Sequence, residues 1–207
     1  MNLFEEGLNR YFDDESIKKL QTAKIGIAGA GGLGSNCASN LVRCGIRNLK
    51  IADFDNVDSS NLNRQFFFIH QIGMKKTDAL RLNLMKINPD LNIETLYTKI
   101  THNNVLEIFK ECDIIVEAFD EAGSKIMLAE EFGSSGKLLI TVSGIGGYGR
   151  SDEIRIKKIK PNFFIVGDFT TEVSKKNPPL SPRINIAAAK QADIVIEYIL
   201  NTDKEYE

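Results

Sequence analysis

A glycine-rich turn between a short apolar strand and a helix is the feature that most constrains the fold of this chain. The strand is predicted over Lys24–Gly29 (KIGIAG), and the turn Gly29–Gly34 (GAGGLG) matches the pattern GxGxxG. A helix then runs to Cys44, Gly45 suits the left-handed cap that ends it, and a second strand follows at Asn48–Asp53. A strand–helix–strand unit of about 30 residues needs a crossover, so the two strands are predicted to be parallel.

The same turn is suited to holding phosphate. The free N–H groups and the dipole at the start of the helix attract an anion, and Gly29, Gly31, Gly32 and Gly34 permit a close approach of the backbone. Asp53 follows about 20 residues later, where its carboxylate can accept hydrogen bonds from ribose hydroxyls. The pattern therefore indicates an adenosine nucleotide, and taken alone it fits NAD-linked dehydrogenases, other nucleotide-binding proteins or a purely structural turn.

The rest of the chain continues the alternation of strands and helices. A helix is predicted over residues 3–20 ahead of the first strand, and a final helix runs from about residue 181 to Leu200. Between them we expect helices at 75–87, 103–110 and 123–132 and strands at 92–98, 113–118 and 138–142. Strands at 153–158 and 163–166 are too close for a helical crossover and are predicted to add an antiparallel edge. We expect a single α/β domain, 1–207, with a Rossmann-like, doubly wound, mostly parallel sheet.

Charge and composition argue against several classes of partner. The 26 basic and 28 acidic residues give a net charge of -2, so neither nucleic acid nor an anionic membrane is expected to bind. The acidic start MNLFEEGLNRYFDDES does not resemble an export signal, and no apolar run approaches the roughly 18 residues that span a bilayer. A cytoplasmic protein is therefore expected. Cys37, Cys44 and Cys112 favour neither a disulfide framework nor, without a CxxC pair, a zinc site.

The segment that discriminates between nucleotide-binding classes follows Asp53. Residues 53–66 read DFDNVDSSNLNRQF, and residues 73–76 read GMKK. This run resembles the signature of the ubiquitin-activating-enzyme superfamily, in particular its bacterial ThiF and MoeB members. Asn88-Pro89, Glu117-Ala118-Phe119-Asp120 and Ser143-Gly144 extend the resemblance, which covers about residues 8–200. The sequence EAFD at residues 117–120 and the short length make the chain most similar to the compact second ThiF family.

The resemblance implies an ATP- and Mg²⁺-dependent adenylyltransferase that acts as a homodimer. Its substrate would be the C-terminal Gly-Gly carboxylate of a ubiquitin-fold sulfur carrier, such as ThiS of thiamine biosynthesis. By resemblance, Arg64 and Lys76 contact the phosphates, Asp120 holds Mg²⁺ and Asn61 helps to position the nucleotide. The chemistry agrees, because transfer at phosphorus needs cations to neutralise the phosphate charge that spreads in the transition state. The structural alternatives are a surface cation for Arg64, a solvated helix-start residue for Lys76 and a helix N-cap for Asp120.

The chain departs from longer relatives at three places. It lacks the zinc-binding CxxC pairs of these relatives, so no zinc is expected. Its loop 168–182 also lacks the cysteine with which some relatives form a persulfide or thioester. Where relatives carry an N-terminal arginine that reaches a neighbouring subunit's ATP, this chain has Asp13. Either Arg10 or Arg183 takes over that role, or no such arginine is used.

Three rival functions remain at this stage. An NAD-dependent oxidoreductase accounts for the glycine turn but leaves the SNLNRQ run unused. A non-catalytic nucleotide-binding scaffold accounts for the lost arginine. The same adenylation chemistry on a molybdopterin-type carrier, a tRNA base or a peptide is the third rival.

Overall fold

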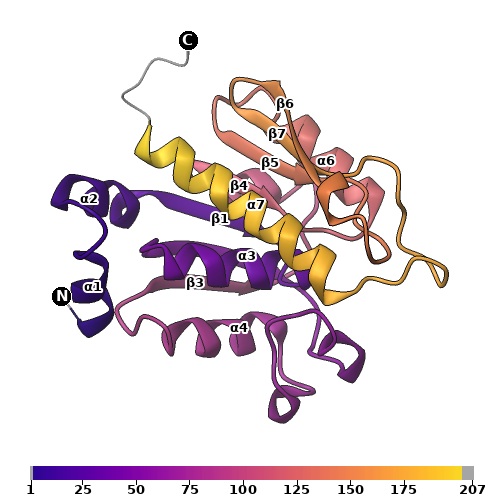
Figure 1. Ribbon diagram of the computed structural model, residues 1–207, viewed down its shortest axis with the longest axis horizontal. Coiled ribbons are helices and arrows are strands. Elements are labelled where there is room, and N and C mark those ends of the chain that lie inside the picture. The colour runs from indigo at the N-terminus through magenta and orange to yellow at the C-terminus, as the bar shows by residue number, and fades with distance from the viewer. Residues whose placement is uncertain (1, 202–207) are drawn as a thin grey trace.

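A computed structural model describes residues 2–201; residues 1 and 202–207, which complete the expected domain 1–207, lie outside the described residues. Its centre is a seven-stranded sheet of order β3-β2-β1-β4-β5-β7-β6 (Figure 1). The strands are β1 (Lys24–Ala28), β2 (Asn48–Asp53), β3 (Asn92–Tyr97), β4 (Ile114–Glu117), β5 (Leu138–Val142), β6 (Arg155–Lys160) and β7 (Phe163–Gly167). The helices are α1 (Leu3–Leu8), α2 (Asp14–Thr22), α3 (Gly32–Arg43), α4 (Lys76–Met85), α5 (Val105–Ile108), α6 (Ala122–Phe132) and α7 (Ser181–Leu200).

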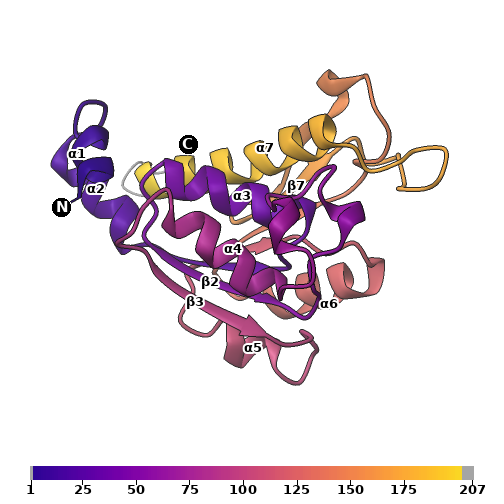
Figure 2. The same cartoon turned by 90° about the horizontal axis from the view of Figure 1, so that it is seen from below.

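Helices cover both faces of the sheet, as a doubly wound fold requires. Figure 2 shows α3, α4 and α7 on one side of the strands and α5 and α6 on the other. Each side has its own apolar core: Ile27, Leu41 and Val195 belong to the first, and Phe109 and Phe132 to the second. Because both faces are buried, the central strands are apolar at nearly every position, which is typical of parallel sheets.

The predicted α/β class and mostly parallel sheet are confirmed, and the antiparallel edge is narrower than expected. Only β6 is antiparallel, to β7, whereas β7 pairs in parallel with β5. After β5 the chain forms β6 at the edge of the sheet. A tight turn then leads into β7, which lies between β5 and β6. Two consecutive strands therefore produce one parallel and one antiparallel pairing.

The prediction of a single helix over residues 3–20 is wrong, because non-helical residues between α1 and α2 divide it into two helices. Asn9 ends α1, and Asp13 begins α2 as its N-cap, with its Oδ1 accepting a hydrogen bond from the Ser16 N–H at 2.7 Å. This carboxylate satisfies an N–H group that the start of a helix leaves without a partner. The aspartate that replaces the expected arginine therefore has a structural use.

The strand order reverses between β1 and β4, and we call the region outside the carboxyl ends of these two strands the crevice. The chain proceeds from β1 to β2 in one direction along the sheet and reaches β4 on the other side of β1. In open α/β sheets, ligands bind outside the carboxyl ends of the strands at such a switch point. The glycine turn leaves β1 at this end, and the segment Ala118–Asp120 leaves β4 beside it.

Candidate functional site

The glycine turn is built so tightly that two of its glycines are required by geometry. Gly29 has a φ of +106°, and a Cβ atom there would meet the Ala118 carbonyl oxygen at 2.8 Å. A Cβ atom on Gly34 would lie 1.9 Å from the Gly29 carbonyl oxygen. Gly31 is the N-cap of α3, and no side chain of the described residues caps this end. The open helix start is suited to accept phosphate oxygens.

Asp53 lies beside this turn, as the sequence predicts, but its carboxylate also holds the turn together. Oδ2 accepts a hydrogen bond from the Ala30 N–H at 2.6 Å, and Oδ1 accepts one from the Asp55 N–H at 2.7 Å. Burial raises the pKa of Asp53, and these two bonds together with the nearby Lys76 oppose that shift. Each carboxylate oxygen can accept a second bond, so a ribose hydroxyl is still a possible partner.

Arg64 lies over the start of α3. A Cβ atom on Gly32 would be 3.5 Å from the Arg64 Cγ atom. Its guanidinium donates to the Ser60 carbonyl oxygen at 3.0 Å and to Asn63 Oδ1 at 2.8 Å. Burial lowers the pKa of Arg64, and attraction to Asp120 acts in the opposite direction. The fold thus brings these two predicted site residues, distant in sequence, into electrostatic contact.

Lys76 is the first residue of α4 and is only 6% exposed, so the interpretation as a solvated helix-start residue is wrong. Its ammonium group lies 2.7 Å from Asp55 Oδ2, and its backbone N–H donates to the Asp55 carbonyl oxygen. A buried ammonium needs such a partner to offset the loss of hydration. Asp55 therefore holds the lysine beside the glycine turn.

Asp120 is exposed on the segment that leaves β4, and it is not the helix N-cap that we weighed as an alternative. Glu121 occupies the N-cap position of α6, without a side-chain capping bond. Asp120 is close enough to Arg64, which lies over the start of α3, for its charge to act on the pKa of that guanidinium. An exposed carboxylate at the carboxyl end of a parallel strand is free to take part in ligand binding.

Asn61 is buried and serves the loop in which it lies. Its Oδ1 accepts a hydrogen bond from the Asp58 N–H at 3.0 Å, completing a capping box with the Asp58 side chain. This arrangement fixes the turn that carries Arg64. A direct contact of Asn61 with a nucleotide stays a prediction.

The two candidate replacements for the missing arginine lie in different surroundings. Arg183 is 2% exposed and pairs with the equally buried Asp168 at 2.5 Å, while it also donates to the Gly149 and Arg150 carbonyl oxygens. Its guanidinium is thus paired inside the protein, which disfavours the alternative that Arg183 takes over the role of the missing arginine. Arg10 is exposed, in the segment between α1 and α2.

The position of α1 and α2 keeps Arg10 away from the crevice of its own chain. Glu5 of α1 pairs with Arg47 just before β2, and the Gln21 carbonyl oxygen of α2 accepts a hydrogen bond from Asn48 at the first residue of β2. Both contacts lie at the amino ends of the strands, opposite the glycine turn (Figure 1). Arg10 therefore lies at the end of the sheet opposite the glycine turn of its own chain.

The donor set fits a metal ion that arrives with a nucleotide rather than a preformed metal cage. Among residues 2–201, no group of three His, Cys, Asp or Glu side chains is arranged to hold a metal ion. Mg²⁺ commonly takes one or two carboxylate oxygens, and phosphate and water complete its shell. The exposed carboxylate of Asp120, at the carboxyl end of β4 and near Arg64, is the kind of single oxygen ligand that this requires.

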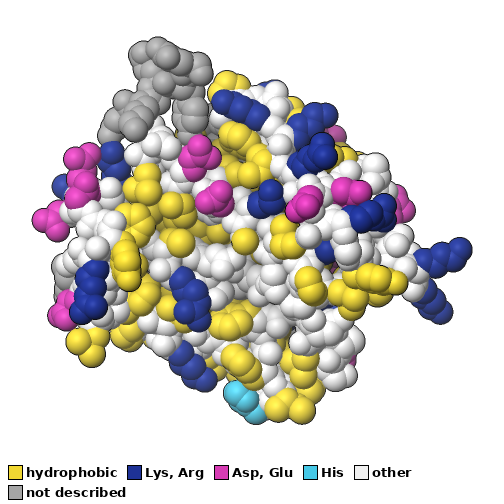
Figure 3. All heavy atoms as spheres, viewed as in Figure 1, with side chains coloured by type: hydrophobic (Ala, Val, Ile, Leu, Met, Phe, Trp, Pro, Cys, Tyr) yellow, Lys and Arg dark blue, Asp and Glu magenta, His cyan; other side chains and the backbone are white. Residues whose placement is uncertain are grey.

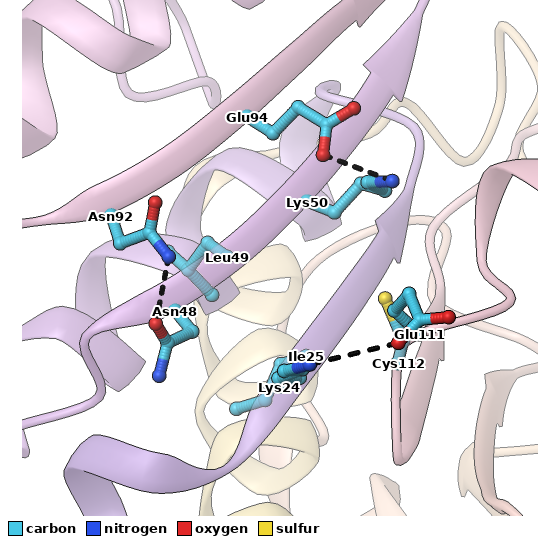
Figure 4. A pocket seen from close by; sticks show the side chains of 9 residues that line it. All are labelled: Lys24, Ile25, Asn48, Leu49, Lys50, Asn92, Glu94, Glu111 and Cys112. Carbon is cyan, nitrogen blue, oxygen red and sulfur yellow. Dashed lines mark hydrogen bonds and ion pairs between the residues drawn. The ribbon is translucent and has the colours of Figure 1, made fainter.

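A cavity of about 240 Å³ lies elsewhere, near the amino ends of β1, β2 and β3 (Figure 4). Its polar side chains pair with one another, Lys50 with Glu94 at 2.9 Å and Lys24 with Glu111 at 3.7 Å. Cys112 also lines it, and burial raises the pKa of this thiol to about 11. The cavity shares no residue with the crevice, and its thiol is protonated at neutral pH.

Comparison of the sequence with models of known protein families identifies the family of this chain. The model of the ThiF family matches residues 5–206. The chain belongs to the ThiF family. The crevice with Arg64, Lys76 and Asp120 is thus a feature of a ThiF-family domain. Within the described residues of this domain, no helix is long and apolar enough to cross a membrane.

Relatives of this ThiF-family chain include larger proteins. It is 33% identical over 146 residues to the protein named adenylyltransferase and sulfurtransferase UBA4 of Candida glabrata, which is 69% of this chain and 33% of that protein. It is 33% identical over 117 residues to a probable molybdopterin-synthase adenylyltransferase of Porphyra purpurea, 56% of this chain and 31% of the relative. The chain thus spans about a third of the length of these relatives.

Among solved structures, the ATP complex of the E. coli tRNA N6-threonylcarbamoyladenosine dehydratase TcdA superposes with a TM-score of 0.84 at 19% identity. The match covers 98% of this chain and 96% of that one. At this level of identity the likeness shows the fold.

Two residues at the site received no role from sequence reasoning, although both lie in the quoted motifs. Gln65 is 8% exposed near Gly31, and its Oε1 has no hydrogen-bond partner within the described part of the chain. Glu117 is fully buried at the end of β4. A charged residue that ends the apolar run DIIV was the available signal for Glu117.

Proposed function

We propose that this ThiF-family domain uses ATP to adenylylate the C-terminal carboxylate of a small ubiquitin-fold carrier that ends in Gly-Gly. The proposal is supported by Arg64, which lies against Gly32 and within electrostatic range of Asp120, and by Lys76, which lies near the Asp53 carboxylate that binds the glycine turn. Two relatives are named adenylyltransferases, which supports the same reaction class. An NAD-dependent oxidoreductase would leave this set of charges without a use.

In the proposed reaction, a carboxylate oxygen of the carrier attacks the α-phosphorus of ATP. A new C–O–P linkage forms, the bond between the α- and β-phosphates breaks, and pyrophosphate leaves. The helix start at Gly31 and Gly32 would receive the phosphates, and Arg64 and Lys76 would neutralise the charge that spreads over their oxygens. Since both cations hold local acceptors in the structure, nucleotide binding would exchange those contacts for phosphate oxygens.

Asp120 is the residue we assign to Mg²⁺. The bound ion would supply positive charge to the phosphate oxygens, and Asp120 would fix its place opposite the start of α3. The carboxylate needs no proton transfer for this role. Asp53 would accept from the ribose of the same nucleotide.

We further propose a homodimer in which Arg10 of each chain faces the crevice of its partner. The proposal is supported by the distance of α1 from its own glycine turn and by the engagement of Arg183 inside the protein. Arg10→Ala, mixed with the inactive Lys76→Ala variant, tests it by complementation. A mixed dimer recovers one intact site if the arginine acts in trans, and it recovers none if it acts in cis.

The carrier that we favour is a sulfur carrier of the ThiS kind, in cytoplasmic thiamine biosynthesis. A molybdopterin-type carrier or a peptide would use the same chemistry. A tRNA acceptor is disfavoured by the net charge of -2, and acidic side chains are interspersed with basic ones on the face that Figure 3 shows. Pyrophosphate exchange with each purified acceptor in turn distinguishes these cases.

The proposed function is tested by exchange of labelled pyrophosphate into ATP in the presence of a Gly-Gly-ended carrier. Arg64→Ala and Lys76→Ala are expected to lower the exchange rate about 100-fold or more, because each removes a cation that stabilises transition-state charge. Arg43→Ala and Lys18→Ala, exposed cations on α3 and α2, are the matched controls and should exchange normally. Near-wild-type exchange by both site variants would refute the assignment.

A further inference from the structure

A buried ion pair lies directly behind the segment that carries Asp120. Glu117 ends β4 with no exposed surface, and Lys125 of α6 reaches it from the side. The Lys125 ammonium lies 3.1 and 3.3 Å from the two carboxylate oxygens and donates to the Val142 carbonyl oxygen at 3.0 Å. Burying a charged pair costs stability that an apolar pair would not, so this pair calls for an explanation beyond packing.

The Glu117 carboxylate joins the last residue of β5 to the segment that follows β4. The parallel pairing of β4 with β5 ends at Val116 and Ile140. Beyond that point Oε1 accepts a hydrogen bond from the Phe119 N–H at 2.6 Å, and Oε2 accepts one from the Val142 N–H at 3.2 Å. The side chain thus bridges the carboxyl ends of the two strands where their backbone hydrogen bonds stop.

The bridged segment is held from its other side by the glycine turn. The Ala118 N–H donates to the Ala28 carbonyl oxygen at 2.9 Å. Gly29 and Gly34 approach Ala118 so closely that a Cβ atom on either would lie within 3.2 Å of an Ala118 atom. Asp120 is the second residue after Ala118, so its position depends on the hydrogen bond from the Phe119 N–H to Glu117.

We propose that Glu117, neutralised by Lys125, is a positioning residue that fixes Asp120 for the metal-bound phosphates of ATP. The proposal rests on the proposed role of Asp120. Ionised Glu117 offers acceptors to both backbone N–H groups, whereas a glutamine in its place offers one oxygen and one NH₂ group. The N–H group of either Phe119 or Val142 then faces the glutamine NH₂ group and loses its hydrogen bond, so the link between the ends of β4 and β5 is lost on one side.

The test is the Mg²⁺ dependence of ATP affinity, measured by calorimetric titration with and without Mg²⁺. Removing a group that orients a metal ligand typically costs about 10- to 100-fold in metal affinity. Glu117→Gln is therefore expected to lose about tenfold or more of the affinity that Mg²⁺ adds, with affinity for Mg²⁺-free ATP unchanged. Asp120→Asn is expected to show the same loss, and combining both changes should add little.

The matched control is Glu5→Gln, because Glu5 is also buried, at 3% exposure, and pairs with Arg47 at the opposite end of the sheet. It should lower the melting temperature without altering the Mg²⁺ effect. If Glu117→Gln does not fold, the double change Glu117→Gln with Lys125→Met removes both charges together and avoids leaving the partly buried Lys125 ammonium without its partner.

Folded Glu117 variants with the wild-type Mg²⁺ effect would overturn the positioning role, as would a wild-type ATP affinity that does not respond to Mg²⁺. The adenylation proposal fails separately: a protein that binds Mg²⁺ and ATP as described but exchanges no pyrophosphate with any carrier contradicts the proposed function and leaves the role of Glu117 standing.

Discussion

Gly34→Ala adds a single methyl group at the most crowded point of the glycine turn. The new Cβ atom would lie 1.9 Å from the Gly29 carbonyl oxygen, 2.9 Å from the Gly29 carbonyl carbon and 3.2 Å from the Ala118 Cβ atom. The nearest atoms are backbone, so the turn or the start of α3 must move by roughly 1 Å or more. Overpacking of this kind costs about 1–3 kcal/mol or more, and better helix propensity returns up to about 1 kcal/mol.

We therefore expect Gly34→Ala to lose about 2 kcal/mol of unfolding free energy, which lowers the melting temperature of a chain of this size by about 4–8 °C. ATP affinity should fall at least about tenfold, since binding sites tolerate displacements of only about 0.5 Å. Gly123→Ala in α6 is the control, because a Cβ atom there meets nothing within 4 Å and alanine favours the helix by up to about 1 kcal/mol. Thermal unfolding and calorimetry measure both. Wild-type stability and ATP affinity in Gly34→Ala would refute the close-approach argument.

Three further results are expected. Calorimetric titration should show tighter binding of ATP with Mg²⁺ than of NAD, and the reverse order would favour the dehydrogenase alternative. Changing Cys37, Cys44 and Cys112 to small residues should leave pyrophosphate exchange intact in the folded protein at some cost in stability; retained ATP binding with abolished exchange would reveal a chemical role for a thiol. Burial alone would raise the pKa of Asp168, but its hydrogen bonds and Arg183 lower it from 3.8 to about 2. The hydrogen bonds from Thr170 and Thr171 together with Arg183 thus contribute about 2 kcal/mol above pH 3.8 that is lost as pH falls toward 2, and in urea titrations Asp168→Asn should flatten this dependence.

The fold class followed from local pattern because each element carries its own signal. The apolar runs at β1, β4 and β5 are buried on both faces, and the helices between them are long enough to serve as crossovers. The last two strands, β6 and β7, were located correctly, but their order in the sheet was not predictable. A hairpin can present either strand to its neighbour, and packing against β5 makes the choice.

The same difference between local pattern and tertiary packing applies to the site residues. The resemblance of residues 53–66 to the family signature predicted a phosphate contact for Arg64, and in the structure its Cγ atom lies close to Gly32 of the glycine turn. The break between α1 and α2 was missed, since the capping bond of Asp13 competes with a continuous amphipathic pattern.

The amino-acid sequence by itself determined the α/β class, the nucleotide-binding turn and the identity of the charged residues around it, because glycine positions, periodicity and motif spacing are local properties. Only the tertiary structure decided which charges are available. It buried Arg183 against Asp168, paired Lys76 with Asp55 and placed Glu117 behind Asp120. Burial and pairing arise between segments far apart in the chain, and the cost of desolvating a charge is set there.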